Sequence, residues 1–492
     1  MAEDAWLAAR LIPTSGINGA EEQERRATSA LLAVMSAVRE FGRALTQPLG
    51  APAGPVQAYI EVPFTLGDQQ CFPDGLIRVV RGQRQWTALV EVKTGSNELR
   101  TEQIERYLDI AREQGFDALI TISNEIPPVA GQHPTAVDKR KLKKVALHHL
   151  PWTEVLTAAV MQMEYRGVAD PDQAWILGEL IRYLEHPRSG AMEFTDMGPA
   201  WVPVRDAVSA GTLRLTDAVV PEVAGRFDAL VRYACLRLGR RLGTEVVPAL
   251  SRRDLAEPAL RTQALSAQLA STGMMTGGLR IPGAVGPLHM TADLRAGKIV
   301  CHVDLDAPRE GRPTTRVNWL VRQLKDAPDT LRIEAFAMHA RGPGCAELLR
   351  TVRNEPTILI ADPTKELRAF RVAQSFAAGT KRGLGRGGFI DSFLDAIDDF
   401  YEQVIQNVKP WMPAPLRLRA PDEPQPVEPV PPSLVSTAIS SQDGTDELAT
   451  QSTESTCDEP SEAGHQTSLD ADQHADTADN STSIDVVPSS ID

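Results

Sequence analysis

Two carboxylates and a lysine, Asp74, Glu91 and Lys93, lie within a stretch of 20 residues. Side chains two residues apart in a β-strand point to the same face, so Glu91 and Lys93 would project together. Mg²⁺ takes carboxylate and carbonyl oxygens, which Asp74, Glu91 and the carbonyl of Val92 can supply. Lys93 would then orient or help to deprotonate a water that attacks a phosphate. The pattern therefore indicates metal-dependent cleavage of a phosphodiester.

The segment 88–93 is expected to be a strand that is covered on both faces. Leu89 points the same way as Glu91 and Lys93, whereas Val90 and Val92 point to the opposite side. Charged groups in such a strand need a partner, and a metal ion is one. Two alternatives stay open. In one, Glu91 and Lys93 face solvent on a surface hairpin, and in the other the fold only binds nucleic acid.

A glutamine and a tyrosine follow on a predicted helix over residues 98–114. Gln103 and Tyr107 lie four residues apart and share one face of that helix. Beside a metal site, these side chains can orient water or contact phosphate. The alternative is an ordinary amphipathic helix that covers the sheet with the stripe Ile104, Leu108 and Ala111.

These motifs resemble those of the PD-(D/E)XK nuclease superfamily, which has the restriction-endonuclease-like fold. Pro73-Asp74 corresponds to the PD element and Glu91-Val92-Lys93 to the (D/E)XK element. The residues from Gln103 to Tyr107 are similar to the QxxxY motif of the RecB-like and lambda-exonuclease-like branch. The hydrophobic approach to the aspartate is shorter here, consisting of Cys71-Phe72-Pro73.

The resemblance implies an enzyme that hydrolyses DNA with Mg²⁺ or Mn²⁺, in defence against foreign DNA or in DNA repair. The alternative class is a catalytically inactive, nuclease-like scaffold that binds nucleic acid or protein partners. The implied catalytic residues are Asp74, Glu91, Lys93, Gln103 and Tyr107, and the implied metal ligands are Asp74, Glu91, Val92 and Glu61.

The superfamily also implies a further acidic residue, either on the strand before the aspartate or on the first helix. Glu61 lies on that strand, and Glu21, Glu22 and Glu24 lie on the helix. The helix trio is also explained as favourable charge at a helix N-terminus, and this explanation is preferred for it.

The surrounding pattern predicts the αβββαβ order of the superfamily core. The expected elements are a helix over 20–45, strands over 57–66, 75–80 and 85–93, a helix over 98–114, a strand over 117–123, a helix over 137–144 and a strand over 145–149.

Length and composition predict an α/β protein with four parts. With 492 residues, of which 42% are hydrophobic, the chain can form more than one core. We expect a nuclease-like domain over 1–165, a helical connector over 166–250, an α/β accessory domain over 251–411 and a disordered, Pro-rich then acidic tail over 412–492. Helices are expected over 151–165, 173–184, 222–242, 315–325 and 388–408, and strands over 278–281, 288–294, 298–305, 331–337 and 357–361.

The net charge of −14 does not exclude nucleic acid as a partner. Residues 421–492 contain sixteen of the 65 acidic residues and none of the 51 basic ones, so the remainder has 51 basic against 49 acidic groups, a charge of +2. Basic candidates for DNA contact lie over 139–144 and 381–386, and the arginines over 309–325 form another candidate face. Residues 166–411 are the candidate surface for a second copy of the chain or a protein partner.

The sequence favours a cytoplasmic bacterial protein without membrane contact. No apolar run reaches the ~20 residues of a membrane span, and the first residues lack the pattern of a signal peptide. The five cysteines have no paired spacing, so neither a zinc site nor a disulfide framework is expected. The preference for Arg over Lys, with abundant Ala and Pro, suggests a bacterial genome of high GC content.

Overall fold

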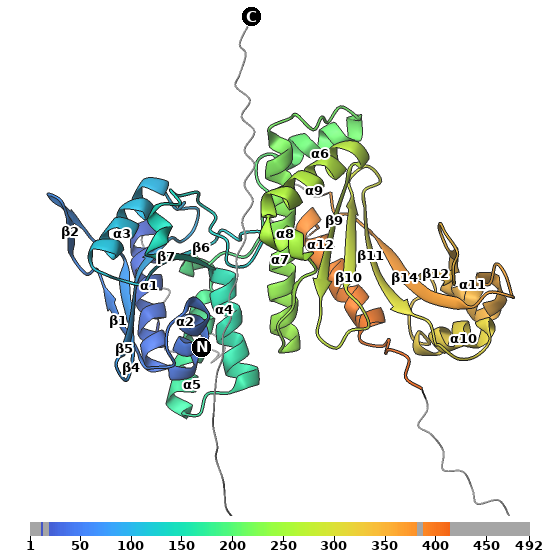
Figure 1. Ribbon diagram of the computed structural model, residues 1–492, viewed down its shortest axis with the longest axis horizontal. Coiled ribbons are helices and arrows are strands. Elements are labelled where there is room, and N and C mark those ends of the chain that lie inside the picture. Colours follow the sequence, from blue (N-terminus) through green and yellow to red (C-terminus); the bar gives the residue numbers. More distant parts are fainter. Residues whose placement is uncertain (1–10, 13–18, 381–386, 414–492) are drawn as a thin grey trace, which may run out of the picture. The chain divides into compact units, whose positions relative to one another are not determined.

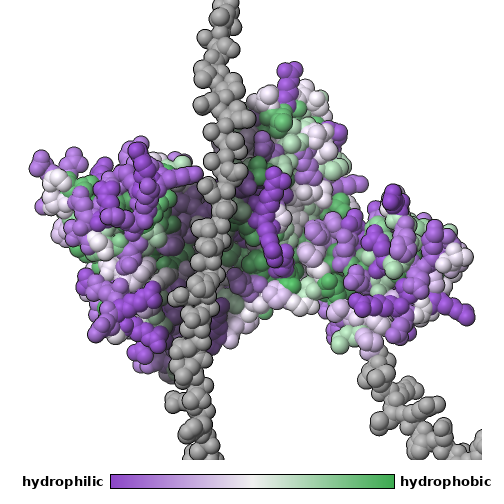
Figure 2. All heavy atoms as spheres, viewed as in Figure 1, coloured by the Kyte–Doolittle hydropathy of each residue, from purple (hydrophilic) through white to green (hydrophobic). Residues whose placement is uncertain are grey.

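The computed structural model describes residues 11–12, 19–380 and 387–413, which belong to one compact unit, Met1–Pro415. The predicted acidic tail and the basic run over 381–386 lie outside the described residues. The described chain is a mixed α/β structure with two large sheets (Figure 1). On the face drawn in Figure 2, hydrophilic side chains separate smaller hydrophobic areas. Within the described part, no helix combines the length and apolar character needed to cross a membrane.

The first sheet has five strands in the order β1-β4-β5-β6-β7. β1 (Val56–Ile60), β4 (Gly75–Arg81) and β5 (Arg84–Val92) pair antiparallel, whereas β6 (Ala118–Ser123) and β7 (Ala146–Pro151) continue the sheet in parallel. A two-residue turn with Gly82 at its first position joins β4 to β5. Gly82 has a φ of 60°, which a glycine adopts without steric cost in such hairpin turns.

Helices cover both faces of this sheet. On one face, α1 (Ala20–Ala37), α2 (Arg39–Thr46), α4 (Trp152–Val160) and α5 (Pro171–Leu184) share a hydrophobic cluster with Val90 and Val92. On the other face, α3 (Thr101–Glu113) packs against Leu76, Leu89 and Leu119. The predicted burial of the Glu91 strand on both sides is therefore confirmed.

The predicted strand over 57–66 is split in the structure. β1 ends at Ile60, and β2 (Phe64–Leu66) pairs with β3 (Gln69–Cys71) in a separate hairpin. Phe64 packs edge-on against Phe116, with ring centroids 5.8 Å apart, which holds the hairpin over the α3 face. The predicted single helix over 20–45 is likewise two helices, because Val38 adopts an extended conformation between α1 and α2.

The predicted helix over 137–144 is wrong. The only helical residues there form a single 3-10 turn, Lys141–Lys143. The side chain of Glu105 accepts the backbone N–H of Asp138, and the side chain of Asp138 accepts that of Arg140. The Asp138 side chain thus forms a local turn with its own backbone, two residues ahead, in place of a regular helix.

The second sheet has seven antiparallel strands in the order β13-β12-β14-β11-β10-β9-β8. Its strands are β8 (Val247–Pro248), β9 (Met274–Arg280), β10 (Leu288–Asp293), β11 (Lys298–Asp306), β12 (Arg332–Ala337), β13 (Cys345–Leu348) and β14 (Leu367–Ala377). α7 (Val219–Leu242) and α12 (Phe389–Phe400) share its core, where Phe227 and Phe393 pack edge to face. The other helices of this part are α6 (Trp201–Ala210), α8 (Arg252–Ala256), α9 (Pro258–Thr272), α10 (Pro313–Gln323) and α11 (Leu349–Asn354).

Most predicted elements of the second half exist, with one exception. The predicted strand over 357–361 is wrong, because Pro356–Leu359 form a 3-10 helix that begins with the proline. β14, the longest strand of this sheet, was not predicted. The helices of the expected connector divide between the two cores, since α5 joins the first hydrophobic cluster and α7 joins the second.

Candidate active site

The ammonium of Lys93 lies among three oxygens at the end of β5. Its Nζ is 2.6 Å from Glu91 Oε1, 2.9 Å from Glu24 Oε1 and 3.0 Å from the carbonyl oxygen of Val92. Glu91 is almost fully buried, with 1% of its surface exposed. A buried carboxylate requires such a partner, because an isolated charge is costly to remove from water.

Asp74 stands at the head of β4 and lies beside Glu91. Its Oδ2 accepts the backbone N–H of Val92 at 2.7 Å, which fixes the carboxylate against the end of β5. The two carboxyl groups are close enough to share a hydrogen bond when one is protonated. Glu91 Oε2 is buried and has no hydrogen-bond donor among the described residues. A proton or a cation is needed between these oxygens to offset their repulsion.

The pKa values follow from this crowding. Burial and then the charge of Asp74 raise the pKa of Glu91 to about 8. Burial also raises the pKa of Asp74, against the lowering effect of the Val92 N–H. Burial alone would lower the pKa of Lys93, but the carboxylates of Glu91 and Glu24 outweigh it and raise the pKa, so the ammonium stays charged.

Gln103 and Tyr107 join the site from α3, while the apolar stripe of the same helix packs on the sheet. Gln103 Nε2 donates to Glu91 Oε1 at 2.6 Å and lies 3.4 Å from the hydroxyl oxygen of Tyr107. Tyr107 donates to the carbonyl oxygen of Phe72, two residues before Asp74, at 3.3 Å. The two interpretations of this helix are thus compatible, because one face carries both the core stripe and the polar contacts.

The acidic residue that α1 contributes is Glu24. Besides Lys93, it accepts a hydrogen bond from Asn97 at 3.3 Å. The preferred explanation of the trio as helix-terminal charge is wrong for Glu24, whereas Glu21 and Glu22 do lie in the first turn of α1. Glu61 is 55% exposed and pairs with Arg25 at 3.2 Å.

Trp152 supports the site and was not anticipated. Its indole Nε1 donates to the carbonyl oxygen of Lys93 at 2.9 Å, from the first turn of α4. This bond anchors the backbone that carries the lysine. Nothing in the sequence around Trp152 indicates this contact, because it depends on where α4 packs.

The donor set fits Mg²⁺ or Mn²⁺ through two carboxylates and one carbonyl. Mg²⁺ commonly binds through one or two carboxylates and completes its shell with water and substrate phosphate. Glu91 has a partnerless buried oxygen, and its carboxyl group lies within hydrogen-bonding reach of Asp74, so the pair offers such a position. Across the described residues, no three His, Cys, Asp or Glu side chains group closely enough to hold a metal ion. A site here therefore needs the backbone carbonyl of Val92 beside the two carboxylates.

Other candidate residues are engaged elsewhere in the structure. Lys141 pairs with Asp109 at 2.6 Å on the side of α3, which leaves less of the 139–144 run free for phosphate. Arg316 is buried and donates to the carbonyl oxygens of Gly311, Leu367 and Arg309, so its role is structural.

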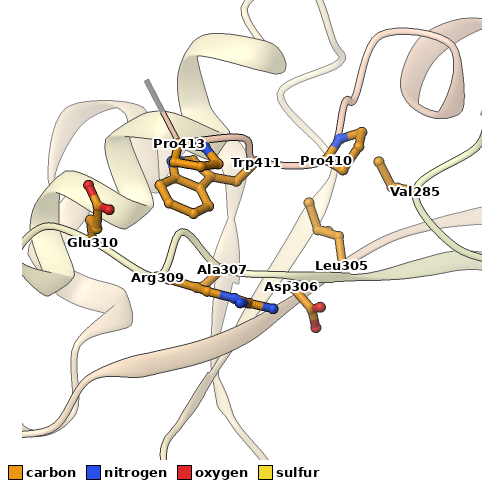
Figure 3. A pocket seen from close by; sticks show the side chains of 9 residues that line it. All are labelled: Val285, Leu305, Asp306, Ala307, Arg309, Glu310, Pro410, Trp411 and Pro413. Carbon is orange, nitrogen blue, oxygen red and sulfur yellow. The ribbon is translucent and has the colours of Figure 1, made fainter. Parts of the chain in front are cut away.

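A cavity of about 500 Å³ lies in the second half of the chain, between the end of β11 and the segment after α12 (Figure 3). It is lined by Val285, Leu305, Asp306, Ala307, Arg309, Glu310, Pro410, Trp411 and Pro413. None of these belongs to the predicted catalytic set.

No protein-family model and no curated protein matches this chain.

Proposed function

We propose that this chain is a nuclease that uses a divalent metal ion to hydrolyse DNA phosphodiester bonds. One observation carries the proposal. The carboxyl groups of Asp74 and Glu91 meet at the ends of neighbouring strands, Glu91 has a buried oxygen without a hydrogen-bond partner among the described residues, and the Lys93 ammonium lies alongside. Such strongly perturbed, converging groups are more typical of functional sites than of structural ion pairs.

The order of elements supports a PD-(D/E)XK-type core in the first half. α1, β1, β4, β5, α3 and β6 follow one another in the expected αβββαβ order, interrupted by α2, the 3-10 helix Gln47–Leu49 and the β2–β3 hairpin. Asp74 directly precedes β4, Glu91 is the last residue but one of β5, and Lys93 directly follows β5. This agreement supports the fold that the resemblance implies.

A bound Mg²⁺ or Mn²⁺ would stabilise charge on the phosphate and acidify a bound water. Asp74, Glu91 and the carbonyl of Val92 are the groups that would hold it. Gln103 fixes the carboxylate of Glu91 by its 2.6 Å hydrogen bond, and Tyr107 ties that helix to the segment before Asp74. Preorganised ligands reduce the reorganisation needed during the reaction.

The charge state of Lys93 defines its role. Because its pKa is raised, Lys93 is protonated at neutral pH and pairs with the carboxylate of Glu24, while Glu91 keeps its proton until a metal ion displaces it. Lys93 therefore acts as a hydrogen-bond donor that orients water or stabilises negative charge, and not as a ready base. Hydrolysis of DNA in this way serves both defence against foreign DNA and DNA repair.

The test is DNA cleavage by the purified full chain with plasmid and linear substrates, in Mg²⁺, Mn²⁺ or EDTA. Cleavage should require the metal and should be lost in Lys93→Ala and Glu91→Gln. Lys298→Ala is the matched control, because Lys298 is exposed at the start of β11. If neither the wild type nor Lys93→Ala cleaves DNA, the nuclease proposal fails and an inactive scaffold is the better account; if both cleave alike, the role assigned to Lys93 is wrong.

A further inference from the structure

The edge of the sheet beside Asp74 carries exposed aromatic side chains. Phe72 is 53% exposed and Tyr59 is 44% exposed. The described chain has two other exposed aromatic residues, Tyr165 and Trp175. Single exposed apolar side chains are normal, but two out of four at one predicted site are a local concentration.

Along the chain and across the β1–β4 pairing, the two rings flank Asp74. Phe72 lies two residues before it, and Tyr59 pairs with Leu76, two residues after it. Phe72 lies in the short segment between β3 and β4, and at roughly 3.3 Å per strand residue Tyr59 lies roughly 7 Å from Asp74 along the direction of β4. That separation is comparable with the distance between neighbouring nucleotides in an extended single strand. β1, which carries Tyr59, is an edge strand, so this side is open.

Tyr107 also connects Phe72 to the site. Its hydroxyl donates to the carbonyl oxygen of Phe72, so the backbone that presents the phenyl ring is held by the same helix that contacts Glu91. The ring is therefore positioned relative to the carboxylates, although its side chain is free to meet a ligand.

Electrostatic attraction to phosphate is weak at this edge. Arg25 is held by Glu21 at 3.0 Å and by Glu61 at 3.2 Å, and Lys93 is held by Glu24 and Glu91. Both of these cations are thus already engaged by acidic side chains. A polyanion that binds here needs another source of affinity, and base stacking on exposed aromatic rings, at about 1–3 kcal/mol per base, supplies it.

We infer that Tyr59 and Phe72 form a stacking platform for unpaired bases, and that the substrate is single-stranded DNA or a frayed DNA end. This inference rests on the proposed nuclease function and names its substrate class. Bases in an intact duplex are stacked on one another and offer no free face, so the platform discriminates against it. A second copy of the chain is the rival occupant, but two rings are a small part of the ≈ 800 Å² per partner that a stable interface buries.

Binding can be measured without cleavage, by fluorescence anisotropy in EDTA with a labelled oligothymidine and a blunt duplex of equal length. Phe72→Ala and Tyr59→Ala should each weaken oligothymidine binding about tenfold or more and leave duplex binding unchanged. Phe72→Trp should retain affinity, because it keeps an aromatic face. Trp175→Ala is the matched control, since Trp175 is also 53% exposed but lies on α5.

The inference is overturned if the wild type does not bind oligothymidine, if the alanine variants bind like the wild type, or if Trp175→Ala loses as much. It is also overturned if the variants change a dimer to a monomer in light scattering, since the patch is then a protein interface. The two proposals fail separately. If the rings do not contribute to binding, cleavage that depends on Lys93 still supports the nuclease. If no cleavage is found, the binding data still show whether the rings bind single strands.

Discussion

Metal binding at the carboxylate pair should depend strongly on pH. A divalent ion binds the ionised carboxylates, so it must displace the proton that Glu91 holds. Burial and Asp74 raise the pKa of Glu91 to about 8. Lowering the pH below 8 therefore protonates Glu91 and weakens metal binding. Raising the pH strengthens metal binding until Glu91 is fully ionised.

The expected size follows from that pKa. A carboxyl group with a pKa of about 8 is about one-tenth ionised at pH 7 and about one-hundredth at pH 6. The apparent affinity for Mg²⁺ should thus fall about tenfold for each pH unit below 8 and level off above pH 9. The pKa of Asp74 is also raised, so its titration can only steepen this dependence.

Isothermal titration calorimetry of the full chain with Mg²⁺ at several pH values measures how steeply the affinity falls with pH and where it levels off. Buffers with different ionisation enthalpies should also show about one proton released per ion at pH 7. Glu91→Gln removes the titrating group and should bind weakly at every pH, whereas Glu61→Gln should follow the wild type. An affinity that is the same at pH 6 and pH 8.5 would refute the proposed ligand pair.

Three further outcomes test the rest of the structure. Glu24→Gln should lower cleavage at least about tenfold because Glu24 holds Lys93, while Glu61→Gln, which changes an exposed side chain, should stay within about twofold. Burial lowers the pKa of His149 to about 3, so the folded chain resists protonation of this side chain, and its contribution to stability is complete above pH 6.5 and is lost as the pH falls toward 3. In urea unfolding, the free energy of unfolding should be about 2 kcal/mol lower at pH 5 than at neutral pH, and His149→Gln should lack this difference. Leu177→Ala should destabilise the chain by about 2–5 kcal/mol in the same assay, and Trp175→Ala by less than about 0.5 kcal/mol, because Leu177 is buried in the first core and Trp175 is exposed.

The sheet that carries the carboxylates could be predicted because its pattern is local. Alternation in 85–93 identifies a strand, and apolar residues on both of its faces indicate cover on both sides. The Gly82 turn joins it to its neighbour through two residues. Spacing alone then brings Glu91 and Lys93 to one face, and in the structure Lys93 Nζ lies 2.6 Å from Glu91 Oε1.

Contacts between distant segments could not be predicted in the same way. Trp152 reaches the backbone of Lys93 across 59 residues, and α5 joins the first core although it follows a predicted boundary at residue 165. β14 was missed because its buried positions do not alternate regularly, and its pairing with β12 shifts register between Phe336 and Ala337. Such irregularity is set by the neighbouring strands and not by the sequence of the strand itself.

Strand periodicity did not predict which further acidic residue, Glu61 or Glu24, lies in the site. Strand register would bring Glu61 beside Asp74, and its N–H does bond to the Asp74 carbonyl oxygen at 3.3 Å. However, Glu61 has a φ of 50°, a left-handed conformation that ends the alternation of β1, and its side chain pairs with Arg25. The place beside the lysine is taken by Glu24, 69 residues away from Lys93 in the sequence. Periodicity assigns a residue to a face only while the backbone stays regular, so acidic residues near strand ends must be tested one by one.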